Sequence, residues 1–317
     1  MKVGLLEPLR VSADLIQQLA APIKEAGHEF VYYDEKTTDP EELAARSQDL
    51  DIAMIANNPY PQAAFRKAKH LKLINVAFTG VDHVDTQAAK EQGIQVANAA
   101  GYSDTAVSEL VIGLVLAVYR QISQGNHNIR QEDFPGAFQG REIKGKTVGI
   151  IGTGKIGMEV ARLFHAFGAE LFAYSRTEKA AAKALGVKYV ELDELLAASD
   201  IVTIHLPQNE TTQGMISRKK LEKMAADAIL VNCARGPIID NEALAELLND
   251  GQIAGAGIDV FTEEPPLPED KPLLHAKNAV LTPHIGYLTD EAMVARAQIA
   301  FDNTLAYLKG HPQNIVE

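Results

Sequence analysis

The sequence lacks several features that define other classes of protein. It contains one cysteine, Cys233, among 317 residues, which excludes a disulfide framework or a thiolate zinc cluster within the chain. Its longest apolar run, residues 110–118, is too short to span a bilayer. Glu7 and Pro8 come too early for the apolar core of a signal peptide. Because a lone cysteine suits a reducing compartment, we expect a cytoplasmic protein.

An excess of positive charge is also missing. Lysine and arginine number 30 against 42 acidic residues, which gives a formal net charge of −12 at pH 7. A broad surface for polyanions is therefore excluded, and we expect neither nucleic acid nor a membrane as a partner. Hydrophobic residues make up 46% of the chain, a share typical of globular proteins, and the length allows two domains. Any anionic ligand must be held by a local pocket.

Short strand-like segments alternate with helical segments in two series. Such alternation predicts an α/β protein with two doubly wound parallel sheets, each covered by helices on both faces. The second series has six expected strands, the number that a complete dinucleotide-binding fold needs. The strands are expected at residues 2–7, 30–33, 52–56 and 73–77 in the first series, and at residues 147–151, 170–174, 201–205, 228–232, 256–260 and 280–282 in the second.

Two further helices and a polar segment complete the chain. We expect a helix at residues 106–120, a surface arm over residues 121–146, and a last helix at residues 289–309. That last helix follows the second series and is expected to return and pack on the first. Its expected apolar face, at 3-4-4-3 spacing, comprises Val294, Ala297, Phe301, Leu305 and Leu308.

A glycine motif follows the first strand of the second series and opens a helix. It reads Gly152-Thr153-Gly154-Lys155-Ile156-Gly157. The first glycine permits a tight turn, the second lets backbone approach a pyrophosphate, and the third allows close packing of helix on strand. The N-terminus of the helix offers N–H donors to the phosphates. The motif therefore predicts a dinucleotide cofactor.

The adenosine ribose of such a cofactor is read about 20 residues further on, usually by an acidic side chain. This sequence has Ser175, Arg176 and Thr177 there. A serine removes the repulsion that an acid exerts on the 2′-phosphate of NADP, and Arg176 and Thr177 can donate to that phosphate. We therefore expect NADP(H) to be favoured, with NAD(H) remaining possible.

Three residues that suit reduction of a 2-oxo acid follow successive strands. Arg235 suits a substrate carboxylate, because its planar fork pairs with carboxylates and stays charged. His284 suits proton transfer near neutral pH, and Glu264 can orient the ring and favour its charged form. Ligands of α/β proteins bind at the carboxyl ends of parallel strands, so these side chains are expected at one edge of the sheet.

Motifs from about residue 73 to residue 286 resemble the family of D-isomer-specific 2-hydroxyacid dehydrogenases. They are the glycine motif, Val231-Asn232-Cys233-Ala234-Arg235-Gly236 with Asp240, Gly257-Ile258-Asp259-Val260-Phe261 with Glu264-Pro265, and Thr282-Pro283-His284-Ile285-Gly286. The absence of the ribose acid resembles the glyoxylate and hydroxypyruvate reductases of this family. The resemblance implies a hydride transfer between NAD(P)H and a small 2-oxo acid or D-2-hydroxy acid.

The resemblance also implies roles for individual residues. Arg235, Glu264 and His284 would be the catalytic residues, with Arg235 and His284 contacting the substrate. Asp259 would contact the nicotinamide carboxamide, and backbone amides of one loop would hold the substrate carboxylate. That loop contains Ala77, Phe78, Thr79 and Gly80. Further cofactor contacts are expected from His205, Pro207, Thr212 and Cys233.

The same resemblance implies the domain arrangement. A Rossmann cofactor domain, residues 100–288, would be inserted into a flavodoxin-like substrate domain formed by residues 1–99 and 289–317. The substrate would lie between the domains, and closure would complete the site. Members of the family are usually dimers joined through the helix after residue 104 and the following arm, so we expect a homodimer.

Other functions remain open at this point. Phosphoglycerate dehydrogenases of the family carry an arginine where Val76 aligns, which disfavours a phosphorylated substrate. An enzyme resembling formate or phosphite dehydrogenases is a second alternative, and a non-enzymatic corepressor that senses NAD(P)H is a third. His83 lies between two aspartates but lacks a recognised ligand spacing, so no metal site is expected.

Overall fold

The computed structural model describes residues 1–131, 138–264 and 266–316. The chain forms two compact units. Unit one comprises Met1–Ser103 and Leu288–Glu317, and unit two comprises Asp104–Tyr287. The expected divisions follow residues 99 and 288, whereas the units divide after Ser103 and Tyr287. The helix that begins unit two starts at Asp104.

Unit one is built on a five-stranded parallel sheet with the order β2-β1-β3-β4-β5. This is the order of flavodoxin-like folds, in which ligands approach the carboxyl ends of the strands near the point where the order reverses. The expected parallel arrangement is confirmed, with β5 added at the edge. The strands are β1 (Lys2–Leu5), β2 (Glu29–Tyr32), β3 (Ile52–Ile55), β4 (Leu73–Val76) and β5 (Gln95–Asn98).

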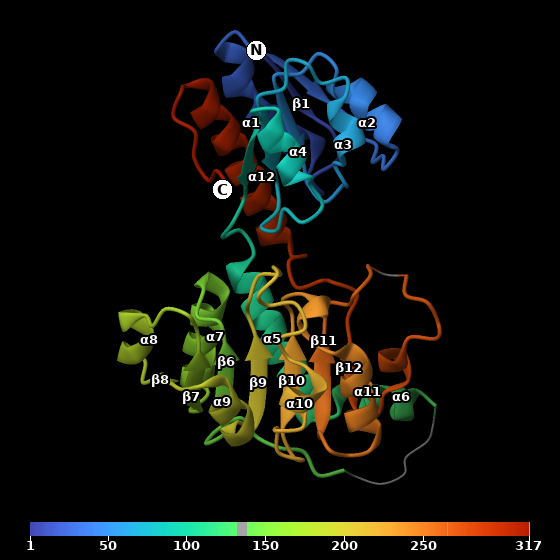
Figure 1. Ribbon diagram of the computed structural model, residues 1–317, viewed down its shortest axis with the longest axis vertical. Helices are drawn as coiled ribbons and strands as arrows, with labels where there is room; N and C mark the ends of the chain where they lie inside the picture. Colours follow the sequence, from blue (N-terminus) through green and yellow to red (C-terminus); the bar gives the residue numbers. More distant parts are fainter. Residues whose placement is uncertain (132–137, 265, 317) are drawn as a thin grey trace. The chain divides into compact units, whose positions relative to one another are not determined.

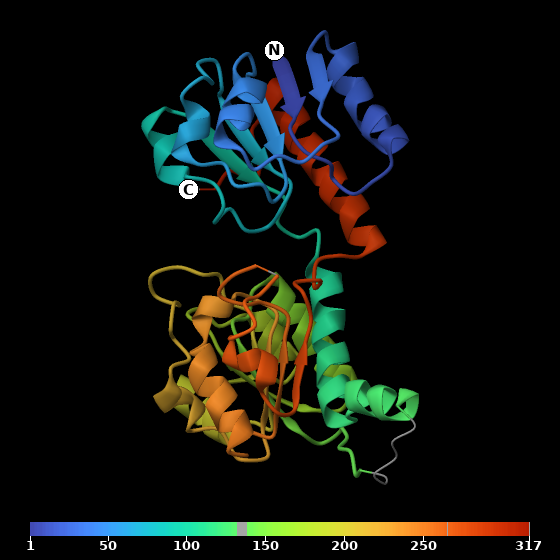
Figure 2. The ribbon, with the colours of Figure 1, turned by 90° about the vertical axis from the view of Figure 1, so that its right-hand side faces the viewer.

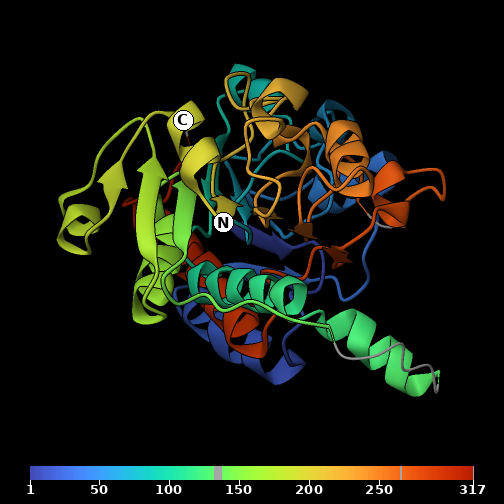
Figure 3. The ribbon, with the colours of Figure 1, turned by 90° about the horizontal axis from the view of Figure 1, so that it is seen from below.

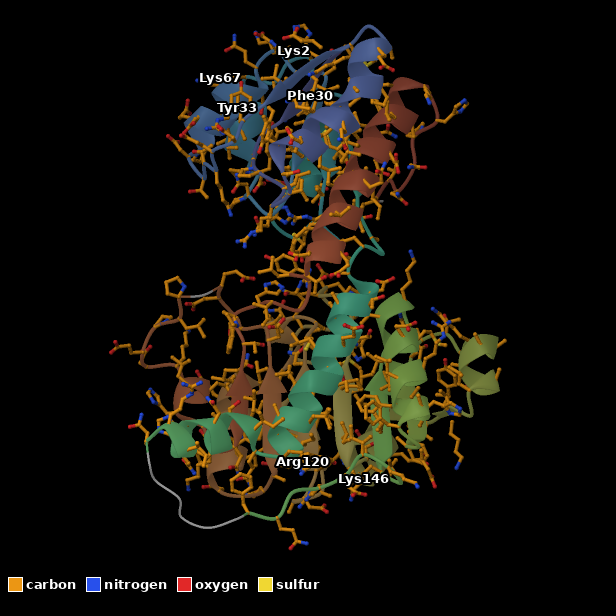
Figure 4. All side chains as sticks on the ribbon, turned by 180° about the vertical axis from the view of Figure 1, so that it is seen from behind. Lys2, Phe30, Tyr33, Lys67, Arg120 and Lys146 are labelled. Carbon is orange, nitrogen blue, oxygen red and sulfur yellow. The ribbon has the colours of Figure 1, made fainter. Side chains whose placement is uncertain are left out.

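Helices cover the sheet of unit one, and the last of them comes from the C-terminal segment of the chain. Phe301 of this helix is fully buried, and its ring centroid lies 5.6 Å from that of Phe30. Phe30 belongs to β2 and is labelled in Figure 4. The expected apolar face is wrong at Val294, which is 48% exposed, because the buried face is centred on Ala297 and Ala300. The helices are α1 (Ala13–Glu25), α2 (Pro40–Ser47), α3 (Gln62–Phe65), α4 (Thr86–Glu91) and α12 (Asp290–Leu308).

Unit two is built on a seven-stranded parallel sheet with the order β12-β11-β10-β9-β6-β7-β8 (Figure 1). Counted from β6, this is the Rossmann order 3-2-1-4-5-6 with β12 as an additional edge strand. The six expected strands are present, and β8 was missed because two residues are too short to show alternation. The strands are β6 (Thr147–Ile151), β7 (Glu170–Tyr174), β8 (Lys188–Tyr189), β9 (Ile201–Ile204), β10 (Ile229–Asn232), β11 (Gly255–Ile258) and β12 (Ala279–Leu281).

Two hydrophobic clusters lie on the two faces of this sheet. One cluster joins the strands to α5 and α7, and the other joins them to α9, α10 and α11. Figure 2 shows α5 on one side of the sheet and α11 on the other. Because both faces are buried, the central strands β6, β9 and β10 consist mostly of valine, isoleucine and leucine without polar alternation. The helices are α5 (Asp104–Tyr119), α6 (Ile122–Arg130), α7 (Lys155–Ala166), α8 (Ala180–Ala184), α9 (Leu192–Ala198), α10 (Arg218–Leu221) and α11 (Asn241–Asn249), with 3₁₀ turns at Gly236–Ile238 and Pro272–His275.

The segment expected as a surface arm begins with helix α6 (Ile122–Arg130). α6 has no buried side chain, and it extends away from the rest of unit two (Figure 3). Residues 132–137 of the arm lie outside the described residues. In the described part of the chain, no single helix is long and apolar enough to cross a membrane; α5 and α6 meet those criteria only as a pair bent by 59°.

Candidate active site

The glycine motif forms a tight turn between β6 and α7. Gly152 has a φ of +99°, and a Cβ there would lie 2.6 Å from the His205 carbonyl oxygen. A Cβ on Gly157 would lie 2.0 Å from the Gly152 carbonyl oxygen, so neither position admits a side chain. At Gly154, the N-cap of α7, a Cβ would meet nothing within 4 Å. The turn therefore packs tightly on its inner side and leaves open space at the helix N-terminus, which fits the pyrophosphate of a dinucleotide.

The loop after β7 presents an uncompensated cation. Ser175 is partly buried, whereas Arg176 and Thr177 are exposed. Among the described residues, the Arg176 guanidinium makes no hydrogen bond or ion pair. The acidic residue of this loop, Glu178, is ion-paired with Lys183 on α8, which offsets its charge. The loop can therefore receive an anionic group.

Asp259 anchors the segment after β12 to the end of β11. The side chain is 1% exposed. Its Oδ1 accepts hydrogen bonds from the Thr282 hydroxyl at 2.5 Å and the Ile285 amide at 2.9 Å, and its Oδ2 accepts one from the Gly286 amide at 2.8 Å. These residues flank His284 on both sides. The carboxylate therefore determines where the imidazole is placed.

His284 itself has a left-handed backbone conformation, with a φ of +53°. Such a conformation costs roughly 1 kcal/mol for a residue with a Cβ and persists only when the surroundings impose it. Here the His284 amide donates to the carbonyl oxygens of Asp259 at 2.9 Å and Thr282 at 3.0 Å. The conformation turns the imidazole toward Glu264, whose Oε1 lies 2.8 Å from Nδ1.

The contact between His284 and Glu264 defines the chemistry open to the ring. A carboxylate that accepts from Nδ1–H leaves Nε2 as the nitrogen that exchanges a proton. Nε2 makes no hydrogen bond within the part of the chain that the structure describes. The His284 side chain is 21% exposed and that of Glu264 75% exposed, so the pair is open to a ligand. The imidazole, oriented by Glu264, can therefore act as a general acid or a general base through Nε2.

The side chain of Asn232, at the end of β10, fixes the backbone around Arg235. Asn232 is fully buried; its Oδ1 accepts from the Ala234 amide at 3.0 Å, and its Nδ2 donates to the Arg235 carbonyl at 2.9 Å. A Cβ on Gly236 would lie 2.1 Å from the Phe261 carbonyl carbon, so the loop after β10 lies directly against the loop after β11. Since β10, β11 and β12 are neighbours, the loops that carry Arg235, Glu264 and His284 share one edge.

Three other residues that are expected to contact the cofactor lie at the same edge of the sheet. Burial lowers the pKa of His205 to about 3, so its ring stays neutral, and its Nε2 is 2.9 Å from the Thr203 hydroxyl. Thr212 closes the loop after β9 by donating to the Pro207 carbonyl at 2.7 Å. Burial, with Asp259 nearby, raises the pKa of the Cys233 thiol, which disfavours the nucleophilic thiolate.

The expected substrate loop lies in unit one, after β4. Ala77 and Phe78 are buried, and the Phe78 ring packs 5.9 Å from that of Tyr102. Carbonyl groups fix the loop: Phe78 accepts from the Ala99 amide at 2.9 Å, and Thr79 accepts from the Asn98 side chain at 2.8 Å. The amides of residues 79–81 donate to no group in the described part of the chain. They are therefore available to an anion.

Sequence reasoning missed the supports of the site. The sequence shows Asn232 only as part of a motif, and it does not show the bonds that join Asp259 to the loop that carries His284. The signal for both is a polar side chain directly after a run of apolar strand residues. Pro265, part of the Glu264 motif, lies outside the described residues. No group of three potential metal ligands occurs in the described ranges.

Comparison with known proteins gives a consistent result. Residues 112–286 match the sequence profile of the NAD binding domain of D-isomer specific 2-hydroxyacid dehydrogenases. A hydroxypyruvate reductase from Blautia hydrogenotrophica is 36% identical over 92% of this chain and 93% of its own length. The crystal structure of a glyoxylate reductase from Paecilomyes thermophila, 29% identical, superposes with a TM-score of 0.89 over 100% of this chain and 98% of that one. An acyclic imino acid reductase in complex with NADPH and D-Arg, 30% identical, superposes with a TM-score of 0.88 over the whole of both chains.

Proposed function

The chain belongs to the D-isomer specific 2-hydroxyacid dehydrogenase family, and we propose that it reduces a small unphosphorylated 2-oxo acid such as glyoxylate or hydroxypyruvate. It is an NAD(P)-dependent oxidoreductase of 2-hydroxy acids. The observation that carries the proposal is the hydrogen bond of 2.8 Å between His284 and Glu264, on the sheet edge that also carries Arg235 and the glycine turn.

We propose the following division of work among the side chains. Arg235 pairs with the substrate carboxylate and draws electron density from the neighbouring carbonyl. His284 donates the proton on Nε2 to the carbonyl oxygen as that oxygen gains charge, and takes it back in the oxidative direction. Glu264 holds the ring through Nδ1 and stabilises the imidazolium. A nicotinamide cofactor, when bound, would supply or accept the hydride.

The proposed substrate class is supported by unit one. The free amides of residues 79–81 suit a carboxylate, and we propose that they bind that of the substrate. Val76, immediately before this loop, is a fully buried core residue of β4 and supplies no cation for a phosphate. An unphosphorylated acid is therefore favoured over a phosphoglycerate. We propose unit one as the substrate domain and unit two as the cofactor domain.

We propose that NADP(H) is favoured over NAD(H). Support comes from Ser175 in place of an acid, from the exposed Arg176, and from the pairing of Glu178 with Lys183. The glycine turn would hold the pyrophosphate, and Thr153 through Ile156 would present the amides of the turn and of α7. Asp259 retains lone pairs that can accept from a carboxamide. His205, Pro207, Thr212 and Cys233 would line the remainder of the cofactor site.

We propose that the chain forms a homodimer through α5 and α6. Ile122, Ile129 and Phe138 are exposed by 55%, 68% and 40%, and α6 buries none of its own side chains. A helix without an apolar contact is unstable alone, which supports coverage by a second copy. A cytoplasmic location is proposed on the single cysteine.

Steady-state kinetics on a panel of acids test the proposal. Glyoxylate, hydroxypyruvate, pyruvate and 3-phosphohydroxypyruvate would be assayed with NADPH and NADH, and formate and phosphite with NADP⁺ and NAD⁺. We expect the highest kcat/KM for glyoxylate or hydroxypyruvate with NADPH. Arg235→Ala serves as the inactive control. Turnover of only the phosphorylated acid, or of formate or phosphite, would contradict the proposed substrate class.

A further inference from the structure

One tyrosine connects the two loops that the proposed cofactor site needs. Tyr189 is the last residue of β8, and its hydroxyl donates to the Thr153 hydroxyl oxygen at 3.0 Å. The same oxygen accepts a hydrogen bond from the Lys179 backbone amide, also at 3.0 Å. Thr153 belongs to the glycine turn, and Lys179 ends the loop that begins after Tyr174. The phenol therefore bridges the two loops.

The direction of this bridge follows from the groups involved. A backbone amide can only donate, so the Tyr189 oxygen is the acceptor toward Lys179. Its own proton is then directed to Thr153, which is 1% exposed. The ring packs against the core cluster that contains Ala173 and Val187. The bond to Thr153 is partly buried, whereas the bond to Lys179 is exposed. Because packing holds the ring, the hydroxyl is a fixed point for the loop.

The loop between Tyr174 and Lys179 has few other supports. Arg176 and Lys179 are exposed, and among the described residues their side chains make no hydrogen bond or ion pair. Lys179 is also the N-cap of α8, which has only five residues. Cations on a loosely held loop bind an anion weakly, because binding must first order them. The Tyr189 bridge removes part of that cost.

We propose that Tyr189 is a positioning residue that holds the loop of residues 175–179 at a fixed distance from the glycine turn and so sets the preference for a 2′-phosphate. The inference rests on the proposed NADP(H) preference. The glycine turn itself is determined by Gly152 and Gly157 and does not depend on the phenol. Loss of the bridge therefore weakens binding of the 2′-phosphate while binding of the 5′-phosphate persists.

Calorimetric titration with two nucleotides tests the inference without any turnover. Adenosine 2′,5′-bisphosphate and 5′-AMP differ only in the 2′-phosphate. In Tyr189→Phe, we expect the affinity for the bisphosphate to fall about fivefold, the effect of one lost hydrogen bond, and that for 5′-AMP to fall less than about twofold. The variant Thr153→Val removes only the other end of the bridge. Combined with Tyr189→Phe, it should cost no more than the larger single effect, because both changes break the same contact.

Tyr119→Phe is the matched control, because it removes a buried hydroxyl that has no hydrogen-bond partner in the described residues. It should leave both affinities unchanged, and circular dichroism confirms that each variant is folded. Full retention of the 2′-phosphate preference in Tyr189→Phe and Thr153→Val, or an equal loss for both nucleotides, would overturn the inference while the cofactor proposal stands. A wild-type protein that binds both nucleotides equally would overturn the cofactor proposal and this inference together.

Discussion

The two ends of the proposed cofactor site are held by different means. At the end with His284, the buried side chains of Asp259 and Asn232 bond the backbone around the functional residues. At the other end, Arg176 lies on an exposed loop whose described contacts include one tyrosine hydroxyl and one ion pair. A proton must be delivered to one atom, whereas an anion is recognised over several ångströms by charge. The end that carries His284 is therefore held rigidly for proton transfer, and the end that carries Arg176 is held more loosely for binding an anion.

The largest loss of activity is expected from a substitution at His284. His284→Asn retains a polar side chain but cannot donate the proton, so we expect kcat for the best 2-oxo acid to fall about 10³-fold. Binding of NADPH, measured by fluorescence, should be unchanged. If the variant kept more than about a tenth of the wild-type kcat, His284 would not be the proton donor.

A smaller effect is expected from the support of the loop that carries His284. Asp259→Asn places an amide where a carboxylate oxygen accepts a backbone N–H, so one of the Ile285 and Gly286 bonds is lost. We expect kcat to fall about 30-fold, the cost of leaving a buried donor unpaired. The control is Asp290→Asn, an exposed change at the start of α12. Equal kcat values for Asp259→Asn and the wild type would show that the tether does not position the ring.

A substitution at the exposed residue Arg176 is expected to have a smaller effect, confined to the KM for NADPH. Arg176→Ala removes a cation proposed to face the 2′-phosphate, and we expect KM for NADPH to rise about tenfold. KM for NADH and both kcat values should stay within a factor of about two. A parallel increase in both KM values would indicate that Arg176 stacks on the adenine, without contact to the phosphate.

The smallest effect concerns stability in acid. The folded pKa of His205 is about 3 against 6.5 for the exposed ring, so below pH 6.5 the unfolded chain binds a proton that the folded chain does not. Stability is therefore lost as the pH falls from 6.5 toward 3, by roughly 1 kcal/mol per pH unit after allowance for partial exposure. His205→Asn should lack this loss. Denaturant titrations at pH 7, 6 and 5 measure the free energy of unfolding of both proteins. An equal dependence of that free energy on pH in the two proteins would contradict this expectation.

Much of the fold was predictable from the sequence. Fully buried parallel strands are runs of apolar residues, as in the first three residues of β10. Glycine marks the turn at Gly152 because no other residue fits there. Short strands were not predictable: β8 has two residues and is recognised only by its pairing with β7. The exposure of Val294 was missed because a helical repeat shows which residues share a face but not where the buried face is centred.

The site was predictable in its residue types more than in its geometry. Strand ends followed by arginine, glutamate and histidine indicated a common edge, and their catalytic roles remain predictions. The left-handed backbone conformation of His284 could not be predicted from the sequence. Histidine rarely adopts it, and the bonds to Asp259 and Thr282 impose it here. The Tyr189 bridge likewise joins residues 36 apart in the sequence, and no local pattern reports it.

A crystal structure of the protein with NADP⁺ and oxamate, a stable mimic of a 2-oxo acid, would test the central claim most directly. The account predicts that His284 Nε2 lies within roughly 3 Å of the oxamate carbonyl oxygen and that the Arg235 guanidinium contacts its carboxylate. Oxamate bound elsewhere, or either side chain turned away from it, would contradict the account.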